Sequence, residues 1–294
     1  MDTLRNIGRV LGAPFRFINT YFKVIVFLFI VFLILSAGGE KEAGEPPNLA
    51  KLYLTTPIFE SESFAAQIEH IKKNKSIKGV LLIIDSPGGA VSASIEIADM
   101  IKELGEQLPI IAYVRGAMAS GSYYAGMYAS EVYANRGALI GSIGVIFSGV
   151  NIAQLLEKLG IKEQGVKAGA YKEVGTINRA WSEQEKAYLE NLIHEQYAMF
   201  YTDVLKARDS KLKSKDYHEF AEGKIFSARS ALELGLIDHI GTMNEAIQAL
   251  QERAQVKEPV WLKKDRFEAY MERLLDGASS KILSLAAPAL KAEL

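Results

Sequence analysis

The chain lacks cysteine altogether and contains few histidines. Because none of the 294 residues is cysteine, disulfide bonds and thiolate metal sites are excluded, and the redox compartment is left unconstrained. The histidines stand far apart and form no pair with ligand spacing, so a metal site has no support. A formal net charge of -1 argues against a nucleic-acid partner, which usually requires a basic face. The four histidines are His70, His194, His218 and His239.

Apolar residues are plentiful. They make up 49% of the chain, which is ordinary for a globular protein and sufficient for a sizeable core. A length of 294 residues allows one large domain or two modest ones. No internal repeat is visible, so we expect a single copy of any catalytic unit.

The N-terminal region joins a basic segment to an apolar run. Residues 1–23 carry four basic side chains against one acid, and residues 24–35 are apolar without a break. We predict residues 24–39 as a transmembrane anchor, although this span is just short of the roughly 20 residues that cross a bilayer. Basic flanks before it and acidic flanks after it place residues 1–23 in the cytoplasm and the rest outside. A cleaved signal peptide is the alternative, favoured by the small residues at 36–39.

Beyond a short acidic linker, residues 40–48, strand-like and helix-like segments alternate. Residues 80–84 form a continuous apolar run, typical of a central strand covered on both faces. The alternation predicts βαβ units, a mostly parallel sheet and an α/β domain over residues 49–254, followed by an amphipathic extension at 255–294. The predicted strands are 52–54, 80–84 and 110–114, and the predicted helices are 61–74, 91–101, 152–159, 182–204, 227–234 and 243–254.

A serine lies in the turn that follows the predicted strand at 110–114. Residues 116–126 are mostly small and open a short helix-like segment. At such a turn the hydroxyl of Ser120 would project from the fold beside backbone N–H groups that lack helical partners, which suits a nucleophile with an oxyanion donor. Small residues also allow a helix to pack closely on a sheet, and this stretch alone leaves both interpretations open.

A second turn, Ser-Pro-Gly-Gly at 86–89, ends the strand at 80–84. Open α/β sheets bind their ligands just beyond the carboxyl ends of the strands. We expect Gly89 and Gly121 to provide the two N–H groups of an oxyanion hole. A plain strand-to-helix turn is the alternative, because Pro-Gly is frequent in turns.

A serine nucleophile needs a base, and no histidine lies near a glycine turn or a strand end. A lysine can serve when burial lowers its pKa. Lys172 is the best candidate because it lies in a small, non-helical segment. Glu173 would oppose such a shift if it faced the same way, but in an extended chain it points to the opposite side. On the residues alone, an ordinary surface lysine is the simpler interpretation.

Several motifs follow one another in the order and spacing of the signal peptide peptidase A (protease IV) family, in its short single-copy form. The resemblance covers about residues 50–250 and the N-terminal anchor. It implies an α/β, ClpP/crotonase-like fold of repeated ββα units and a Ser/Lys dyad, with no cofactor or metal. The motifs are Asp85-Ser-Pro-Gly-Gly89, Met118-Ala-Ser-Gly-Ser-Tyr-Tyr124, Ile140-Gly-Ser-Ile-Gly-Val145, Ala170-Tyr-Lys172 and Gly235-Leu-Ile-Asp238.

By position, the resemblance implies that Ser120 is the nucleophile and Lys172 the general base. Ser142 resembles the second serine of the family, which orients the lysine by a hydrogen bond, and Gly89 matches the oxyanion glycine. Ser122 departs from the glycine that many members carry, and we expect it to affect either the turn or the primary specificity pocket.

The resemblance also implies the substrates and the location. The implied function is that of a membrane-anchored serine endopeptidase, which degrades cleaved signal peptides and other hydrophobic peptides at the membrane. The expected assembly is a ring-shaped homo-oligomer with active sites shared between subunits. The expected location is the inner (cytoplasmic) membrane, with one pass and the catalytic domain on the extracytoplasmic (periplasmic) side. An inactive scaffold and a crotonase-type acyl-CoA enzyme are the alternatives; the latter gives no role to Ser120 and Lys172.

Overall fold

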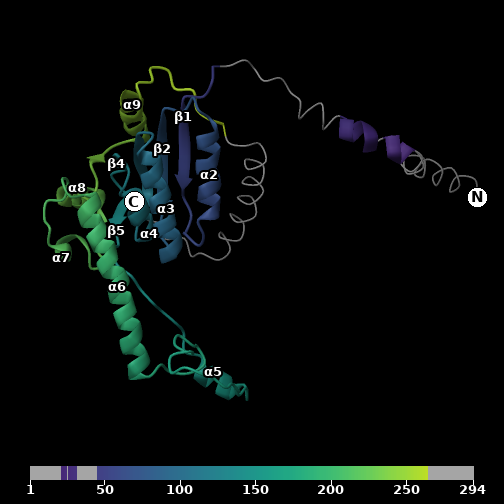
Figure 1. Ribbon diagram of the computed structural model, residues 1–294, viewed down its shortest axis with the longest axis vertical. Coiled ribbons are helices and arrows are strands. Elements are labelled where there is room, and N and C mark those ends of the chain that lie inside the picture. The colour runs from purple at the N-terminus through teal and green to yellow at the C-terminus, as the bar shows by residue number, and fades with distance from the viewer. Residues whose placement is uncertain (1–20, 25, 32–44, 264–294) are drawn as a thin grey trace, which may run out of the picture. The chain divides into compact units, whose positions relative to one another are not determined.

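The computed structural model describes residues 21–24, 26–31 and 45–263 (Figure 1). The chain divides into two units, Met1–Glu45 and Pro46–Leu294.

In the first unit, residues 21–24 and 26–31 are helical and mostly exposed. Among the residues that the structure describes, no helix is both long enough and apolar enough to cross a membrane. The rest of the predicted anchor, residue 25 and residues 32–39, lies outside the described residues, as does most of the predicted C-terminal extension, residues 264–294.

A mostly parallel sheet forms the centre of the second unit, which confirms the predicted α/β class. Five strands pair in parallel. A sixth pairs in parallel with the end of β3 and antiparallel with a seventh. In sheet order the five are β1 (Leu49–Leu54), β2 (Gly79–Ser86), β3 (Ile110–Ala119), β4 (Glu131–Ala134) and β7 (His239–Ile240); the other two are β5 (Leu139–Gly141) and β6 (Ile225–Ser227).

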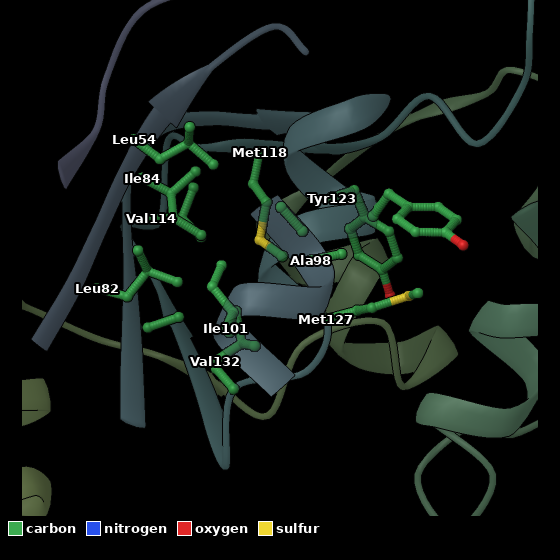
Figure 2. Close-up of a cluster of buried hydrophobic side chains, with 14 of the residues drawn as sticks. Leu54, Leu82, Ile84, Ala98, Ile101, Val114, Met118, Tyr123, Met127 and Val132 are labelled. Atoms are coloured by element: carbon green, nitrogen blue, oxygen red, sulfur yellow. The ribbon is translucent and has the colours of Figure 1, made fainter. Parts of the chain in front are cut away.

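Helices cover both faces of this sheet. Side chains alternate between the faces along each strand. On one face Leu82, Ala98 and Ile101 belong to one buried cluster (Figure 2), and on the other Leu81 and Leu250 belong to a second. The helices are α2 (Glu62–Lys73), α3 (Val91–Gly105), α4 (Gly121–Gly126), α5 (Ala153–Lys158), α6 (Glu183–Ala207), α7 (Tyr217–Phe220), α8 (Ala228–Leu234) and α9 (Met243–Ala254).

Each predicted helix and strand is present within a few residues of its expected bounds. The Ser182 hydroxyl accepts from the Glu185 N–H, and the Glu185 carboxylate accepts from the Ser182 N–H, so the capping box that starts α6 is confirmed. β3 runs to Ala119, past the predicted end at 114, so Ser120 follows the strand directly.

Between β5 and α6 the chain forms an arm, defined here as residues 144–182. Figure 1 shows this arm extending away from the sheet, with α6 leading back to it. No residue from 144 to 184, a fully described stretch, is buried. Large apolar side chains are exposed along it, among them Ile146 (87%) and Leu159 (64%). Within the protomer the arm therefore has no core of its own.

Candidate active site

Ser120 lies at the junction of β3 and α4 in a rarely adopted backbone conformation. Its φ is 52° and its ψ is -123°, which for a residue other than glycine costs about 1–3 kcal/mol. The Ser120 N–H donates to the Gly141 carbonyl (2.8 Å), and the Ser120 carbonyl accepts from the Tyr124 N–H (3.0 Å). These bonds hold the turn, while the side chain stays partly exposed and has no hydrogen-bond partner among the described residues.

Ser122 secures the same turn from inside. It is fully buried, and its hydroxyl accepts from the Ala119 N–H (2.8 Å) and donates toward the Ser86 carbonyl (2.7 Å). It thereby links the ends of β2 and β3. Ser122 does not line the pocket beside Ser120, so of the two expected effects the structure supports the one on the turn.

The glycine turn after β2 packs directly against the Ser120 turn. Gly88 has a φ of 90°, and a Cβ there would lie 2.5 Å from the Gly121 nitrogen and 2.9 Å from the Ser120 Cβ. A Cβ on Gly89 would lie 1.9 Å from the Ile58 carbonyl oxygen. Neither the Gly89 N–H nor the Gly121 N–H has an acceptor in the described part of the chain. Two free donors therefore flank the serine, as oxyanion stabilisation requires.

A small pocket opens beside Ser120. The walls include Gly89 and Gly121, so the pocket begins at the serine and at both predicted oxyanion donors. Apolar side chains complete it, and they come from α3, from the chain after β5 and from α6. Those side chains are Val91, Ile95, Val145, Met199 and Phe200.

Ser142 lies one residue beyond the carbonyl that holds the Ser120 N–H. Its φ is 50°, and its own N–H donates to the Lys224 carbonyl (2.7 Å). Next to it, the Gly223 N–H donates to the Ile143 carbonyl (2.9 Å). The loop before β6 therefore fixes the backbone of Ser142 beside the Ser120 turn.

Lys172 lies on the arm, in an exposed turn. Its N–H donates to the Gly169 carbonyl (3.3 Å), and its ammonium group has no hydrogen-bond or ion-pair partner among the described residues. The preceding Tyr171 stacks on Tyr188 with 4.8 Å between ring centroids. Tyr188 precedes Phe200, a pocket residue, by twelve positions on α6, or about 18 Å of helix.

Of the five predicted site residues, one chain therefore brings three together, places a fourth next to them and leaves the fifth apart. Gly89, Ser120 and Gly121 line one pocket, with the backbone of Ser142 next to it. Lys172 does not reach these residues. The distance along α6 between Tyr188, beside the Lys172 turn, and the pocket residue Phe200 exceeds the length of a lysine side chain.

Glu173 does not follow the extended geometry that the sequence suggested, since residues 171–175 form a turn. The Glu173 carboxylate binds Lys167 (2.8 Å) and lies 3.8 Å from Arg179. The hydrogen bond from Lys167, more than any other contact, holds the pKa of Glu173 below its usual value. Arg179 also binds Glu185 (2.6 Å) and lowers the pKa of that carboxyl, together with the Ser182 N–H, to about 2. These contacts tie the Lys172 turn to the start of α6.

A partly exposed serine on a strained strand-to-helix turn, flanked by free N–H donors, defines the class of serine hydrolases. The comparison with known families specifies which kind. The model of peptidase family S49 matches residues 102–257, and the chain belongs to this family.

The relatives agree with this assignment. A candidate protease of Methanocaldococcus jannaschii is 33% identical over 247 residues, which are 78% of each chain. A candidate signal peptide peptidase SppA of Enterococcus faecium is 34% identical over 67% of this chain and 57% of its own. The chloroplastic serine protease SPPA of Arabidopsis thaliana is 28% identical over 86% of this chain and 37% of its own. The predicted signal peptide peptidase A family is confirmed, and the protein is a serine peptidase.

Proposed function

We propose that this S49 peptidase is a membrane-anchored endopeptidase with Ser120 as nucleophile and Lys172 as general base. Its substrates are cleaved signal peptides and other hydrophobic peptides at the membrane. The observation that carries the proposal is the strained, partly exposed Ser120 between the free N–H groups of Gly89 and Gly121. We also assign the α/β core to the ClpP/crotonase-like fold.

The reaction proceeds by covalent catalysis. Lys172 accepts the hydroxyl proton of Ser120 while the serine oxygen bonds to the peptide carbonyl carbon. The N–H groups of Gly89 and Gly121 donate to the resulting oxyanion. Collapse breaks the C–N bond, and the lysine returns its proton to the leaving amine. Water, deprotonated by the same lysine, then hydrolyses the acyl-enzyme and restores Ser120. Ser142 orients the lysine amine by a hydrogen bond.

The lysine in this scheme comes from a neighbouring copy in a ring-shaped homo-oligomer. Two observations support this. Lys172 lies far along the arm from the pocket of its own protomer, and no residue from 144 to 184, all described, is buried. An exposed apolar surface of this extent is typical of an interface. A second copy seated on the arm would cover its apolar side chains and bring Lys172 to the neighbouring serine.

The apolar run within residues 24–39 supports membrane attachment. The basic residues before it and the acidic residues after it favour a catalytic domain on the extracytoplasmic, periplasmic side of the inner membrane. An anchored enzyme would meet hydrophobic peptides at a raised local concentration.

The test is hydrolysis of a fluorogenic peptide by the full chain and by three variants. Ser120→Ala and Lys172→Ala are each expected to lower kcat by about 10³-fold or more while leaving assembly intact. Lys162→Ala changes another exposed lysine of the arm and is expected to keep the parent rate. Activity that survives in Ser120→Ala or Lys172→Ala would overturn the dyad.

A further inference from the structure

We propose that Tyr124 sets the size of the substrate side chain that enters the pocket beside Ser120, and that the pocket takes small apolar side chains. The inference rests on the proposed function, because it assigns the pocket to the residue whose carbonyl Ser120 attacks. Ser120, Gly121 and Gly89 all line this pocket, so the side chain of the substrate residue whose carbonyl is attacked lies next to the pocket and can enter it.

The pocket is small. Its volume is about 30 Å³, and on the same measure one water molecule needs ~10–15 Å³. A methyl or isopropyl group fits this space without rearrangement, whereas an aromatic ring does not.

The lining favours an apolar group. Two polar side chains besides Ser120 line the pocket, and both use their hydrogens elsewhere. The Ser94 hydroxyl donates to the Ala90 carbonyl (2.8 Å), and the Tyr124 hydroxyl donates to Asp203 (2.5 Å). No charged side chain is among the residues that line it. A charged substrate side chain would enter unpaired, at a high cost in free energy.

Tyr124 is the residue that cannot move aside. Its hydroxyl binds Asp203, and its ring packs edge to face on Phe200 with 4.9 Å between centroids. Asp203 and Phe200 are three residues apart and therefore lie on one side of α6. Burial, followed by the bond to Asp203, raises the pKa of Tyr124, which keeps its hydroxyl a donor. The ring is thus tethered at its tip and packed on its side.

The fixed position of α4 strengthens this restraint. The neighbouring Tyr123 is fully buried, and its hydroxyl donates to the Leu236 carbonyl (3.0 Å). Figure 2 shows Tyr123 within the buried cluster close to Ala98 and Met127. Neither the helix nor the Tyr124 ring can yield to a larger substrate without breaking buried contacts.

The experiment measures kcat/KM of the full chain on four peptidyl-aminocoumarin substrates that differ only in the residue before the scissile bond: alanine, valine, leucine and phenylalanine. The parent is expected to prefer alanine and valine. Tyr124→Leu empties part of the pocket, and the leucine-to-alanine ratio is expected to rise by about 10-fold or more. Tyr124→Phe keeps the ring without the tether, and its ratio is expected to rise by about 2–3-fold.

The matched control is Tyr128→Phe. Tyr128 lies just beyond α4, and the charge of Asp203 contributes, after burial, to raising its pKa to about 12, but it does not line the pocket. Its substrate ratio is expected to equal that of the parent. If Tyr124→Leu does not fold, Phe200→Leu opens the same pocket from α6 and serves in its place.

The outcomes separate the two proposals. In one outcome the parent shows Ser120-dependent hydrolysis, and every folded pocket variant keeps the parent's order of substrates. This outcome overturns the role of Tyr124 and leaves the proposed function standing. A parent that prefers phenylalanine overturns the small pocket. Absence of Ser120-dependent hydrolysis on all four substrates overturns the proposed function and the pocket assignment with it.

Discussion

The turn around Ser120 and the arm that carries Lys172 are built in opposite ways. At the turn, Gly88, Gly89 and Gly121 pack so closely that added Cβ atoms would overlap neighbouring atoms, and the buried Ser122 bonds the ends of two strands. Along the arm, the residues from 144 to 184, all described, bury no side chain. The Ser120 turn is thus fixed completely within one chain, whereas Lys172 lies on an exposed surface that, under the proposed function, a neighbouring copy covers.

The strongest challenge to this comparison is a mixing experiment. Ser120→Ala and Lys172→Ala chains are each expected to be inactive alone. If neighbours share sites, co-expression is expected to restore about a quarter of the parent rate, because one arrangement in four pairs an intact serine with an intact lysine. Recovery is measured as Ser120-dependent hydrolysis after co-purification through two different tags. A mixed assembly without activity would place both groups in one chain.

Glycine substitutions distinguish the two regions next. Gly89→Ala forces a Cβ to within 1.9 Å of the Ile58 carbonyl oxygen and displaces the N–H group that we propose as an oxyanion donor. We expect kcat to fall by about 10²–10³-fold. On the arm, a Cβ at Gly165 meets nothing within 4 Å, so Gly165→Ala is expected to retain the parent rate. Comparable kcat values for the two variants would contradict the contrast.

Ion pairs offer a third contrast, measured as stability against pH. Asp238 is partly buried, and burial alone would raise its pKa. Contacts with Arg208, Lys211 and the Val132 N–H outweigh burial and lower the pKa below the usual 3.8. A lowered folded-state pKa stabilises the protein above the unfolded pKa, and this stabilisation is lost as the pH falls through the folded value.

Asp238→Asn is therefore expected to cost about 3 kcal/mol at pH 7, because Arg208 is buried and loses its charge partner. Below about pH 4, the unfolding free energy of this variant is also expected to fall less steeply with decreasing pH than that of the parent. Glu173→Gln, in an exposed pair of the arm, is expected to change both far less, because solvent screens that pair. Urea unfolding at several pH values measures both variants, and equal losses would refute the distinction.

The smallest expected effect concerns Ser122, the buried serine behind the Ser120 turn. Ser122→Ala leaves the Ala119 N–H and the Ser86 carbonyl without their buried partner. We expect a loss of about 1–3 kcal/mol in unfolding free energy, with the order of preferred substrates unchanged. A changed substrate order with unaltered stability would assign Ser122 to the pocket instead.

The placement of the Ser120 turn beside the glycine turn at 86–89 was predictable from the sequence. Gly89 and Gly121 occupy turns at the ends of adjacent parallel strands, and parallel pairing brings such ends to one edge of the sheet. The pocket residues on α6 were not predictable as such. Phe200 lies on an apolar helical face, and that pattern is the same for a core residue and for a pocket wall.

On the arm, sequence patterns did not predict where the residues lie in space. Lys172 was singled out because it lies in a small, non-helical segment. That local pattern does not predict which part of the protein the Lys172 turn packs against. Its position depends on the Tyr171–Tyr188 stack and on the contacts of Glu173 and Arg179, which join segments with no common periodic pattern. The short strands β4, β5, β6 and β7 were missed because two to four residues carry too little alternation to be recognised.

The uncovered arm has a consequence for how activity depends on the amount of protein. Association through such a surface obeys mass action, so the fraction of occupied arms rises with the concentration of chains. Under the proposed function, the hydrolysis rate per chain would climb with protein concentration and fade on dilution. A scarce or newly made copy would thus be harmless to surrounding proteins until it met others of its kind.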